Sequence, residues 1–383
     1  MIYLDAAATG CYRDVDDIII DSMVNAMQDH WMNPSSLYNS KTKEEINKCR
    51  KNIASSINAK PNEIIFTSSA SESNNMAIRG WSDEIWMKTF KTPYIITTKI
   101  EHKSILKLVE ESNIDAVVKY CNVDKNGIVD CESLERMLSI CGNEPVLVSV
   151  HFANNEIGSI QPLKDIADLV HRYKGILHCD ATQAFGKIPI NVEDIGVDMM
   201  SVSGHKISPV LKGIGFLYKK NCIKIQPLIF GVQENGLRGS TENTFGIIGL
   251  AKALEFCDIG SKKIVELCEK RNYFMKRLIE EFDCKINGSL INRLPNNISV
   301  TFPQNITGES LLYLLDMSDI QVSTGSACNS KEIKPSHVLK IIGLSDEESM
   351  KTIRITIPDD ITYEEIEYVI DEIKKAIKLI ELN

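Results

Sequence analysis

Two short polar segments of this sequence carry residue types that work together in amine chemistry. Lys206 ends the segment Ser201-Val-Ser-Gly-His-Lys206, which overlaps the end of an apolar run. A lysine at the end of a buried strand can be desolvated and kept partly neutral, as a Schiff-base lysine must be. Asp180 follows a second apolar run, and an acid there can keep a pyridine nitrogen protonated, so that the ring accepts electrons. Taken alone, each has a commoner interpretation: a surface lysine on a loop, and a helix N-cap.

A third segment, Phe66-Thr-Ser-Ser-Ala-Ser-Glu72, has the composition of an anion-binding helix start. Ser69 and Glu72 have the S-x-x-E spacing of a capping box, which predicts that a helix begins here. Free N–H groups at a helix start, together with the hydroxyl groups of Ser69 and Ser71, suit a phosphate. Capping boxes are common, so this segment is weak evidence by itself. The sequence has no G-x-G-x-x-G or Walker A run, the usual marker of a dinucleotide or nucleoside triphosphate.

Cys328 differs from most other cysteines of the chain in its setting. It ends the small polar run Ser323-Thr-Gly-Ser-Ala-Cys328, which predicts an accessible loop. Positive charge from His337, Lys331 and Lys334 nearby would favour the reactive thiolate. Without other evidence, an incidental surface thiol is the commoner interpretation.

The composition limits the classes of protein to which the chain can belong. It has 383 residues, of which 43% are hydrophobic and 25% are charged, and a net charge of −9. This balance excludes disordered and collagen-like chains, and no apolar run reaches the roughly 18 residues of a membrane span. An acidic chain without a basic block is a poor nucleic-acid binder. The N-terminus lacks the basic region of a secretory signal, and the 11 cysteines include no C-x-x-C pair. We therefore expect a cytoplasmic protein with no metal site and no membrane or nucleic-acid partner.

The sequence pattern predicts that alternating strands and helices position these residues. Seven apolar runs predict strands: Ile64–Phe66, Tyr94–Thr98, Val117–Tyr120, Val146–His151, Ile176–Cys179, Met199–Val202 and Ile214–Tyr218. Most segments between them have helical spacing. Such alternation predicts a mostly parallel sheet covered on both faces, with ligands at the carboxyl ends of the strands.

The remaining segments predict helices at the N-terminal side and a smaller α+β domain at the C-terminal side. A helical stretch over about 14–58 is broken at Asn33-Pro-Ser-Ser36, and a second, over about 243–282, is broken near Gly260. After it come predicted strands at Asn297–Phe302, Ile320–Val322 and Thr352–Ile357, a helix at Glu309–Leu315, and a last helix whose apolar stripe runs from Ile366 to Ile380.

Seven short motifs occur together in the order and spacing of one known family. They are Asn33-Pro-Ser-Ser36, Phe66-Thr-Ser68, Glu101-His-Lys103, Asn154-Asn-Glu-Ile-Gly158, Asp180-Ala-Thr-Gln183, Ser203-Gly-His-Lys206 and Gly325-Ser-Ala-Cys328. From Tyr3-Leu-Asp5 to the last helix, the chain resembles the cysteine desulfurases, pyridoxal-phosphate enzymes of the class-V aminotransferase group. The resemblance implies fold type I: a large α/β domain (16–257) with a mostly parallel seven-stranded sheet flanked by helices, and a small α+β domain (1–15 and 258–383).

The resemblance also implies roles for individual residues. Lys206 would form the Schiff base with the cofactor, Asp180 would pair with the pyridine nitrogen, and Gln183 would contact the ring hydroxyl. His102 would stack on the ring and relay protons, and Arg354 would clamp the substrate carboxylate through its bidentate fork. The other implied cofactor contacts are Asn155 at the ring edge, Ser203, His205, Ala70 and Ser71 at the phosphate, and Thr241 at the phosphate of the partner subunit.

Several positions depart from the family pattern. Ala6 replaces the usual Asn, Ser69 the usual Gly, Ser71 the usual Thr and Tyr38 the usual His, the Gly of Arg238-Gly-Ser-Thr241 is shifted by one position, and the segment 208–212 is one residue longer. None removes a chemical group that the reaction needs. They bear on phosphate geometry and substrate preference.

The implied function is conversion of L-cysteine to L-alanine, with the sulfur passed as a Cys328 persulfide to an acceptor protein. The alternatives on the same fold are a selenocysteine lyase, which could use the same residues, and a class-V aminotransferase, which needs no mobile cysteine. A catalytically silent scaffold would be favoured only if Lys206 or Cys328 were missing. The long form of the loop from Ser323 to Pro335 favours an iron–sulfur scaffold as acceptor over thiolation or DNA-modification proteins. We expect a homodimer in which Thr241 completes the partner's site.

Overall fold

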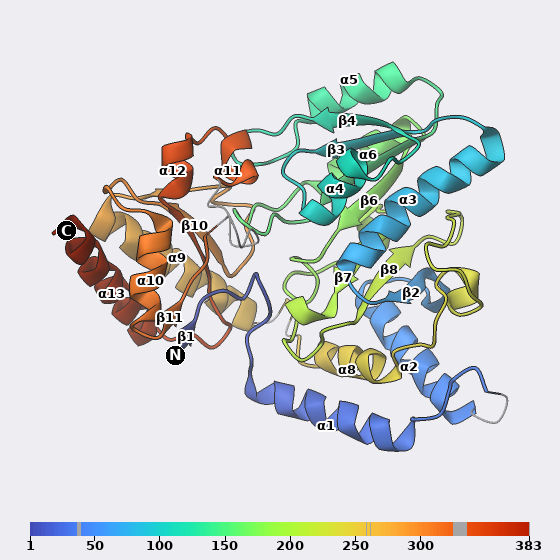
Figure 1. Cartoon of the computed structure of the whole chain (residues 1–383), viewed down its shortest axis with the longest axis horizontal. Helices are drawn as coiled ribbons and strands as arrows, with labels where there is room; N and C mark the ends of the chain where they lie inside the picture. The colour runs from blue at the N-terminus through green and yellow to red at the C-terminus, as the bar shows by residue number, and fades with distance from the viewer. Residues whose placement is uncertain (37–39, 258, 261, 325–334, 383) are drawn as a thin grey trace.

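A seven-stranded sheet forms the centre of the larger part of the molecule (Figure 1). This computed structural model describes residues 1–36, 40–257, 259–260, 262–324 and 335–382. The strands lie in the order β2 (Ile64–Thr67), β8 (Gly215–Lys219), β7 (Met199–Ser203), β6 (Ile176–Asp180), β5 (Val146–His151), β3 (Tyr94–Thr98) and β4 (Val117–Cys121). β8 is antiparallel to both neighbours, whereas all other neighbours pair in parallel. The predicted strands and the mostly parallel sheet are confirmed, with strand ends shifted by one residue at most.

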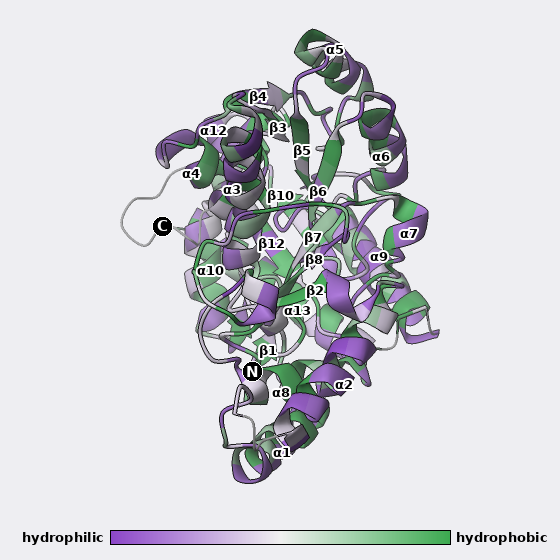
Figure 2. Cartoon of the chain, turned by 90° about the vertical axis from the view of Figure 1, so that its right-hand side faces the viewer, coloured by the Kyte–Doolittle hydropathy of each residue, from purple (hydrophilic) through white to green (hydrophobic). Residues whose placement is uncertain are grey.

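Helices cover both faces of this sheet. Strands β5, β7 and β8 are buried along their whole length, which requires cover on both sides. Figure 2 shows the interior strands β5 and β6 as largely hydrophobic between more polar helices. The helices of this part are α1 (Asp14–Asp29), α2 (Ser40–Ser56), α3 (Ala70–Thr89), α4 (Lys103–Glu111), α5 (Cys131–Cys141), α6 (Leu163–Arg172), α7 (Val192–Ile195) and α8 (Thr244–Leu254). Of these, α1 and α2 pack against α8 below the sheet in Figure 1.

A smaller α+β lobe follows, with a core of its own. Its antiparallel sheet has the order β12 (Thr352–Thr356), β10 (Asn297–Thr301) and β9 (Lys285–Ile286). Its helices are α9 (Lys262–Phe282), α10 (Gly308–Asp316), α11 (His337–Ile341), α12 (Asp346–Met350) and α13 (Tyr363–Glu381). The apolar stripe predicted for the last helix is buried in this core. The strand β9 was not predicted, because two residues are too short to show a period.

The N-terminus joins the small lobe and then crosses to the large one. Strand β1 (Ile2–Tyr3) pairs in parallel with β11 (Ile320–Gln321), and Leu4 lies in the core of the small lobe. The next residues, Asp5–Gly10, which we name the N-terminal strap, reach the large lobe, where the N–H of Gly10 donates to the carbonyl of His205 at 2.8 Å. The domain boundaries expected from the sequence, at 15/16 and 257/258, stay a prediction.

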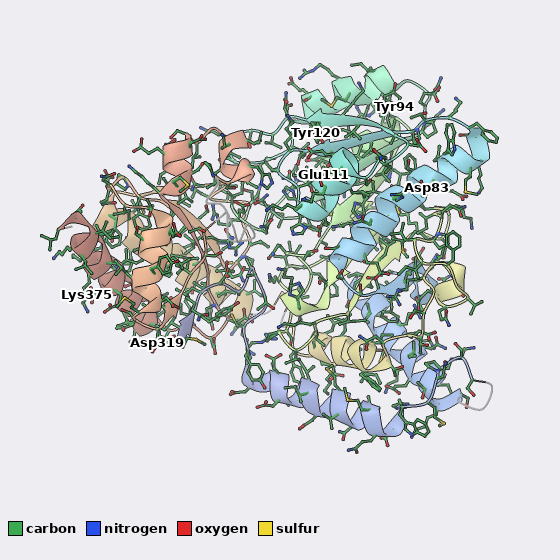
Figure 3. The ribbon with its side chains drawn as sticks, in the orientation of Figure 1. Asp83, Tyr94, Glu111, Tyr120, Asp319 and Lys375 are labelled. Carbon is green, nitrogen blue, oxygen red and sulfur yellow. The ribbon has the colours of Figure 1, made fainter. Side chains whose placement is uncertain are left out.

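The parallel strands run toward the small lobe. In Figure 3 the labelled Tyr94, the first residue of β3, lies farther from the small lobe than the labelled Tyr120, near the end of neighbouring β4. The carboxyl ends of the strands therefore face the region between the two lobes, where α/β sheets bind their ligands. Within the described ranges, every helix is too short or too polar to cross a membrane.

Candidate active site

Lys206 lies on a 3-10 turn, Gly204–Lys206, directly after β7. The turn packs tightly against the chain that returns in β8, because a side chain at Gly204 would meet Ile214 at 2.9 Å. The Nζ of Lys206 donates hydrogen bonds to the carbonyl oxygens of Ala7 at 2.8 Å and Ala8 at 2.6 Å. The predicted lysine is thus anchored by the sheet at its backbone and by the N-terminal strap at its amine.

Asp180 is the last residue of β6, the strand beside β7, and it is 5% exposed. Its Oδ2 accepts a hydrogen bond from Asn74 Nδ2 at 2.8 Å, and its Oδ1 accepts from the N–H of Thr182 at 3.0 Å and from the Thr182 hydroxyl. Residues 182–187 form turns, so the alternative interpretation of Asp180 as a helix N-cap is wrong.

A buried polar network lies beneath these strand ends. His178 accepts or donates on both ring nitrogens, with Nδ1 at 2.9 Å from Ser149 Oγ on β5 and Nε2 at 2.9 Å from Ser201 Oγ on β7. Burial lowers the pKa of His178 to about 4, against a smaller opposing effect of Asp180. A neutral imidazole therefore ties three neighbouring strands together two residues before Asp180.

His102 is the N-cap of α4, and its ring is partly open to solvent. Its Nδ1 accepts from the N–H of Ser104 at 3.1 Å and lies 2.8 Å from the Ser104 hydroxyl. Nδ1 is therefore the unprotonated nitrogen of the neutral ring, and Nε2 carries the proton. Desolvation by the surrounding protein lowers the pKa of His102, the Asp180 carboxylate opposes this effect, and Lys206 adds to it.

The predicted anion site lies at the start of α3. Ser69 is the N-cap, and its hydroxyl accepts from the N–H of Glu72 at 3.3 Å. The first main-chain hydrogen bond of the helix is donated by Ser73, so the N–H groups of Ala70 and Ser71 point beyond the helix end. The φ of Ser69 is −175°, an extended conformation that any residue adopts, so the Ser in place of the family's Gly is accommodated.

The predicted capping box is only half formed. The carboxylate of Glu72 turns away from Ser69 and accepts from the N–H of Ser68 at 2.8 Å and from Arg238 Nε at 2.9 Å. Arg238 thereby connects the helix start to the segment that carries Thr241. Thr241 itself is exposed. The sequence predicted the helix start correctly and missed this competing partner.

Ser203 and His205, the other predicted phosphate contacts, flank the lysine turn. Ser203 is buried at the end of β7, and Nδ1 of His205 lies 3.3 Å from the Thr9 hydroxyl of the strap. Burial lowers the pKa of His205 to about 4, with Lys206 and Lys212 adding to the effect. His205 therefore faces the site as a neutral ring.

Arg354 on β12 reaches the site from the small lobe. Its Nη2 forms an ion pair with Asp5 of the strap at 2.6 Å, and its Nη1 donates to the carbonyl of Asn155 at 3.2 Å. Its buried Nε has no hydrogen-bond partner among the described residues. The structure thus brings Arg354, Asn155 and the strap together, and Nε is the guanidinium donor that still lacks an acceptor in the described part of the chain.

Gln183 forms a hydrogen bond with the N-terminal strap, a contact that the sequence analysis did not predict. Gln183 is 5% exposed, and its Nε2 donates to the carbonyl of Ala7 at 3.0 Å, the same oxygen that receives Lys206. Sequence reasoning missed Ala7, Ala8 and Asn74, because main-chain carbonyls and a helix-interior amide leave no motif. Cys328 lies outside the described residues, and among those residues no cluster of three or more metal-ligating side chains occurs.

The arrangement can hold a phosphorylated ring with a basic nitrogen. The helix start of α3 would suit a phosphate, Asp180 would suit a proton-bearing ring nitrogen, and Lys206 has its amine between the sheet and the strap. Arg354 has the donor geometry for a carboxylate. These groups fit pyridoxal phosphate and an amino acid.

The comparisons with known proteins point to the same family. A family model described as aminotransferase class-V matches residues 2–369. A curated relative, the cysteine desulfurase IscS of Dictyoglomus turgidum, is 39% identical over 385 residues, covering 98% of this chain and 94% of the relative.

Among solved structures, a NifS-like protein superposes with a TM-score of 0.88 at 33% identity, over 100% of both chains. A structure titled SspA in complex with cysteine has a TM-score of 0.80 at 33% identity, over 94% of this chain and 99% of the other.

Proposed function

We propose that this chain, which belongs to the class-V aminotransferase family, is a cysteine desulfurase that converts L-cysteine to L-alanine. The observation that carries the proposal is the placement of Asp180 and Lys206 at the ends of neighbouring strands, with Arg354 brought to the same region by the small lobe. Full-length similarity to cysteine desulfurases supports it. We place the reaction in the cytoplasm, as the cysteine usage of the sequence indicates.

Pyridoxal phosphate is the proposed cofactor. Asp180 would hold its ring nitrogen, Gln183 its ring hydroxyl, and Ala70, Ser71, Ser203 and His205 its phosphate. When bound, the cofactor supplies an electron sink for the charge that develops at the substrate α-carbon. The neutral state of His205 leaves its ring able to donate one hydrogen bond to the phosphate without a second positive charge beside Lys206.

Residues of this chain would then carry out the proton and sulfur transfers. Lys206 would anchor the cofactor through its amine and move the α-proton, since both tasks need a nucleophilic amine at one place. Arg354 would orient the substrate carboxylate. The thiolate of Cys328 would attack the substrate sulfur, so that the carbon–sulfur bond breaks, a sulfur–sulfur bond forms, and protons complete alanine. His102, with its proton on Nε2, would relay such a proton.

The proposed partners are a second copy of the chain and a sulfur-acceptor protein, with an iron–sulfur scaffold favoured. Thr241 is exposed in the single chain, and three hydrophobic side chains shortly before it are also exposed: Ile229, Phe230 and Val232. An exposed apolar segment beside a phosphate-contacting residue supports a homodimer with shared sites. Light scattering of the purified protein should give the mass of a dimer, and a fully active monomer would contradict this part of the proposal.

Product analysis with L-cysteine and L-selenocysteine tests the function. Release of alanine from L-cysteine, with one persulfide on Cys328 in a single turnover, is the expected result. The Cys328→Ser variant should bind the cofactor and release almost no alanine, whereas Cys222→Ser, a matched change at an exposed cysteine, should behave like the parent. Alanine from selenocysteine alone would indicate the lyase, and amino transfer to a keto acid would indicate the aminotransferase.

A further inference from the structure

Lys187 is a charged residue near the site to which neither the family motifs nor the proposed reaction gives a role. It follows Gln183 by one turn of chain, and its Nζ donates to Gln183 Oε1 at 3.1 Å. Burial, the nearby Lys206 and Arg354 lower the pKa of Lys187 to about 8, against the opposing charges of Asp359 and Cys11. Placing a positively charged lysine near Lys206 and Arg354 costs free energy, so the position of Lys187 beside Gln183 calls for an explanation.

The contact settles the orientation of the Gln183 side-chain amide. The ammonium group of a lysine only donates hydrogen bonds, so the atom that faces Lys187 is the amide oxygen. At the opposite end, the carbonyl of Ala7 can only accept, so the atom 3.0 Å from it must be the amide nitrogen. The second N–H of that nitrogen is then left for another acceptor.

We propose that Lys187 is a positioning residue that holds the Gln183 amide with its N–H groups toward the cofactor ring. The inference rests on the proposed function, in which Gln183 contacts the ring hydroxyl. In its ionised form that hydroxyl is an acceptor, and a flipped amide would face it with a second acceptor, which is repulsive. In the structure, the amine of Lys187 is the hydrogen-bond donor at the oxygen end of the Gln183 amide.

The strap makes this orientation part of a larger arrangement. Ala7 uses one carbonyl oxygen for both Gln183 and Lys206, so the ring-hydroxyl contact and the cofactor-linking amine share a single acceptor. A change in the Gln183 amide therefore alters the surroundings of Lys206 as well. This sharing predicts that Lys187 influences the titration of the bound cofactor in addition to its affinity.

Equilibrium binding of pyridoxal phosphate to the cofactor-free chain tests the proposal. Lys187→Met should raise the dissociation constant about fivefold, the loss expected for one hydrogen bond. Lys187→Arg, which retains donor and charge, should stay within about twofold of the parent. In a Gln183→Ala background, Lys187→Met should have an additional effect below about twofold, because the group that it orients is gone.

The absorption spectrum of the bound cofactor gives a second readout. Lys187→Met should raise the pH midpoint of its spectral transition, because a positive charge and an N–H donor near the ring are lost. An effect of Lys187→Met on affinity that is as large without Gln183 as with it would overturn the proposal. Lys187→Ala, which also removes the donor, replaces the Met variant if the latter does not fold by circular dichroism. A parent chain that binds no pyridoxal phosphate would instead overturn the proposed function.

Discussion

The two sides of the candidate site are built in different ways. On the sheet side, Asp180 ends β6 and Lys206 ends the turn after β7, above a buried histidine that links three strands. On the side of the small lobe, Arg354 is held by one ion pair with Asp5 and one main-chain contact. The sheet side is set by local structure, whereas the other side depends on the packing of two lobes. We therefore expect changes on the sheet side to affect the chemical step, and changes on the other side to affect substrate binding.

The largest effect is expected for Lys206→Ala on the sheet side. Loss of the amine that anchors the cofactor and moves the proton should lower kcat by about 10³-fold or more. Borohydride treatment should no longer attach the cofactor covalently. Lys212→Ala, a change at an exposed lysine six residues later, should retain the covalent link. A covalent adduct in the Lys206 variant would contradict the assignment.

A smaller effect of a different kind is expected for Arg354→Lys. The ammonium group preserves the charge opposite Asp5 and loses the fork that fits a carboxylate. The KM for L-cysteine should rise by about 10- to 100-fold, as for the loss of a charged hydrogen bond, with kcat changed little. Steady-state kinetics measures both constants. A fall in kcat with an unchanged KM would contradict the assignment of substrate binding to the side of the small lobe.

The stability of the sheet side should depend on pH through His178. Its folded-state pKa is about 4, below the value of about 6.5 for an exposed histidine, so the unfolded chain takes up a proton first as the pH falls. The free energy of unfolding should therefore decrease between pH 6.5 and pH 4, by roughly 3 kcal/mol for this residue. Urea unfolding across this range measures the decrease.

The control for this prediction is a histidine variant elsewhere. His178→Asn should flatten the pH dependence, although not abolish it, because the pKa of His205 is lowered in the same direction. His30→Asn, outside the site, should leave the slope close to that of the parent. An equal slope in all three proteins would rule out the buried histidine as the cause.

The smallest effect is expected for Ser240→Gly, in the segment that carries Thr241. Ser240 has a φ of 94°, in a region that favours glycine, whereas the preceding Gly239 is packed so closely that a side chain would overlap the carbonyl oxygen of Phe230. Ser240→Gly should stabilise the protein by about 1 kcal/mol, and Gly239→Ala should destabilise it. Thermal unfolding of the two variants compares adjacent positions, and shifts of the same sign would contradict this account of the displaced glycine.

The sequence predicted the sheet side better than the side of the small lobe, for a physical reason. Strand ends and the helix start at Ser69 are local features, which periodicity and capping residues reveal. The pairing of Asp5 with Arg354 joins residues 349 positions apart, and neither residue carries a local signal of the other. The same holds for Asn74, which contacts Asp180 from the interior of a helix. Contacts made by main-chain carbonyls, such as those of Ala7, cannot be predicted from residue types at all.

The pairing of β1 with β11 has a consequence for the order in which this protein becomes functional during synthesis. The ribosome makes β1 and the strap early, but the strand that pairs with β1 begins only at Ile320. The sheet of the large lobe and Lys206 are complete long before then, while the carbonyls that hold the lysine amine still lack the anchor that places them. A nascent chain therefore cannot assemble this centre until β11 has emerged, so the chemistry of the site waits for the small lobe.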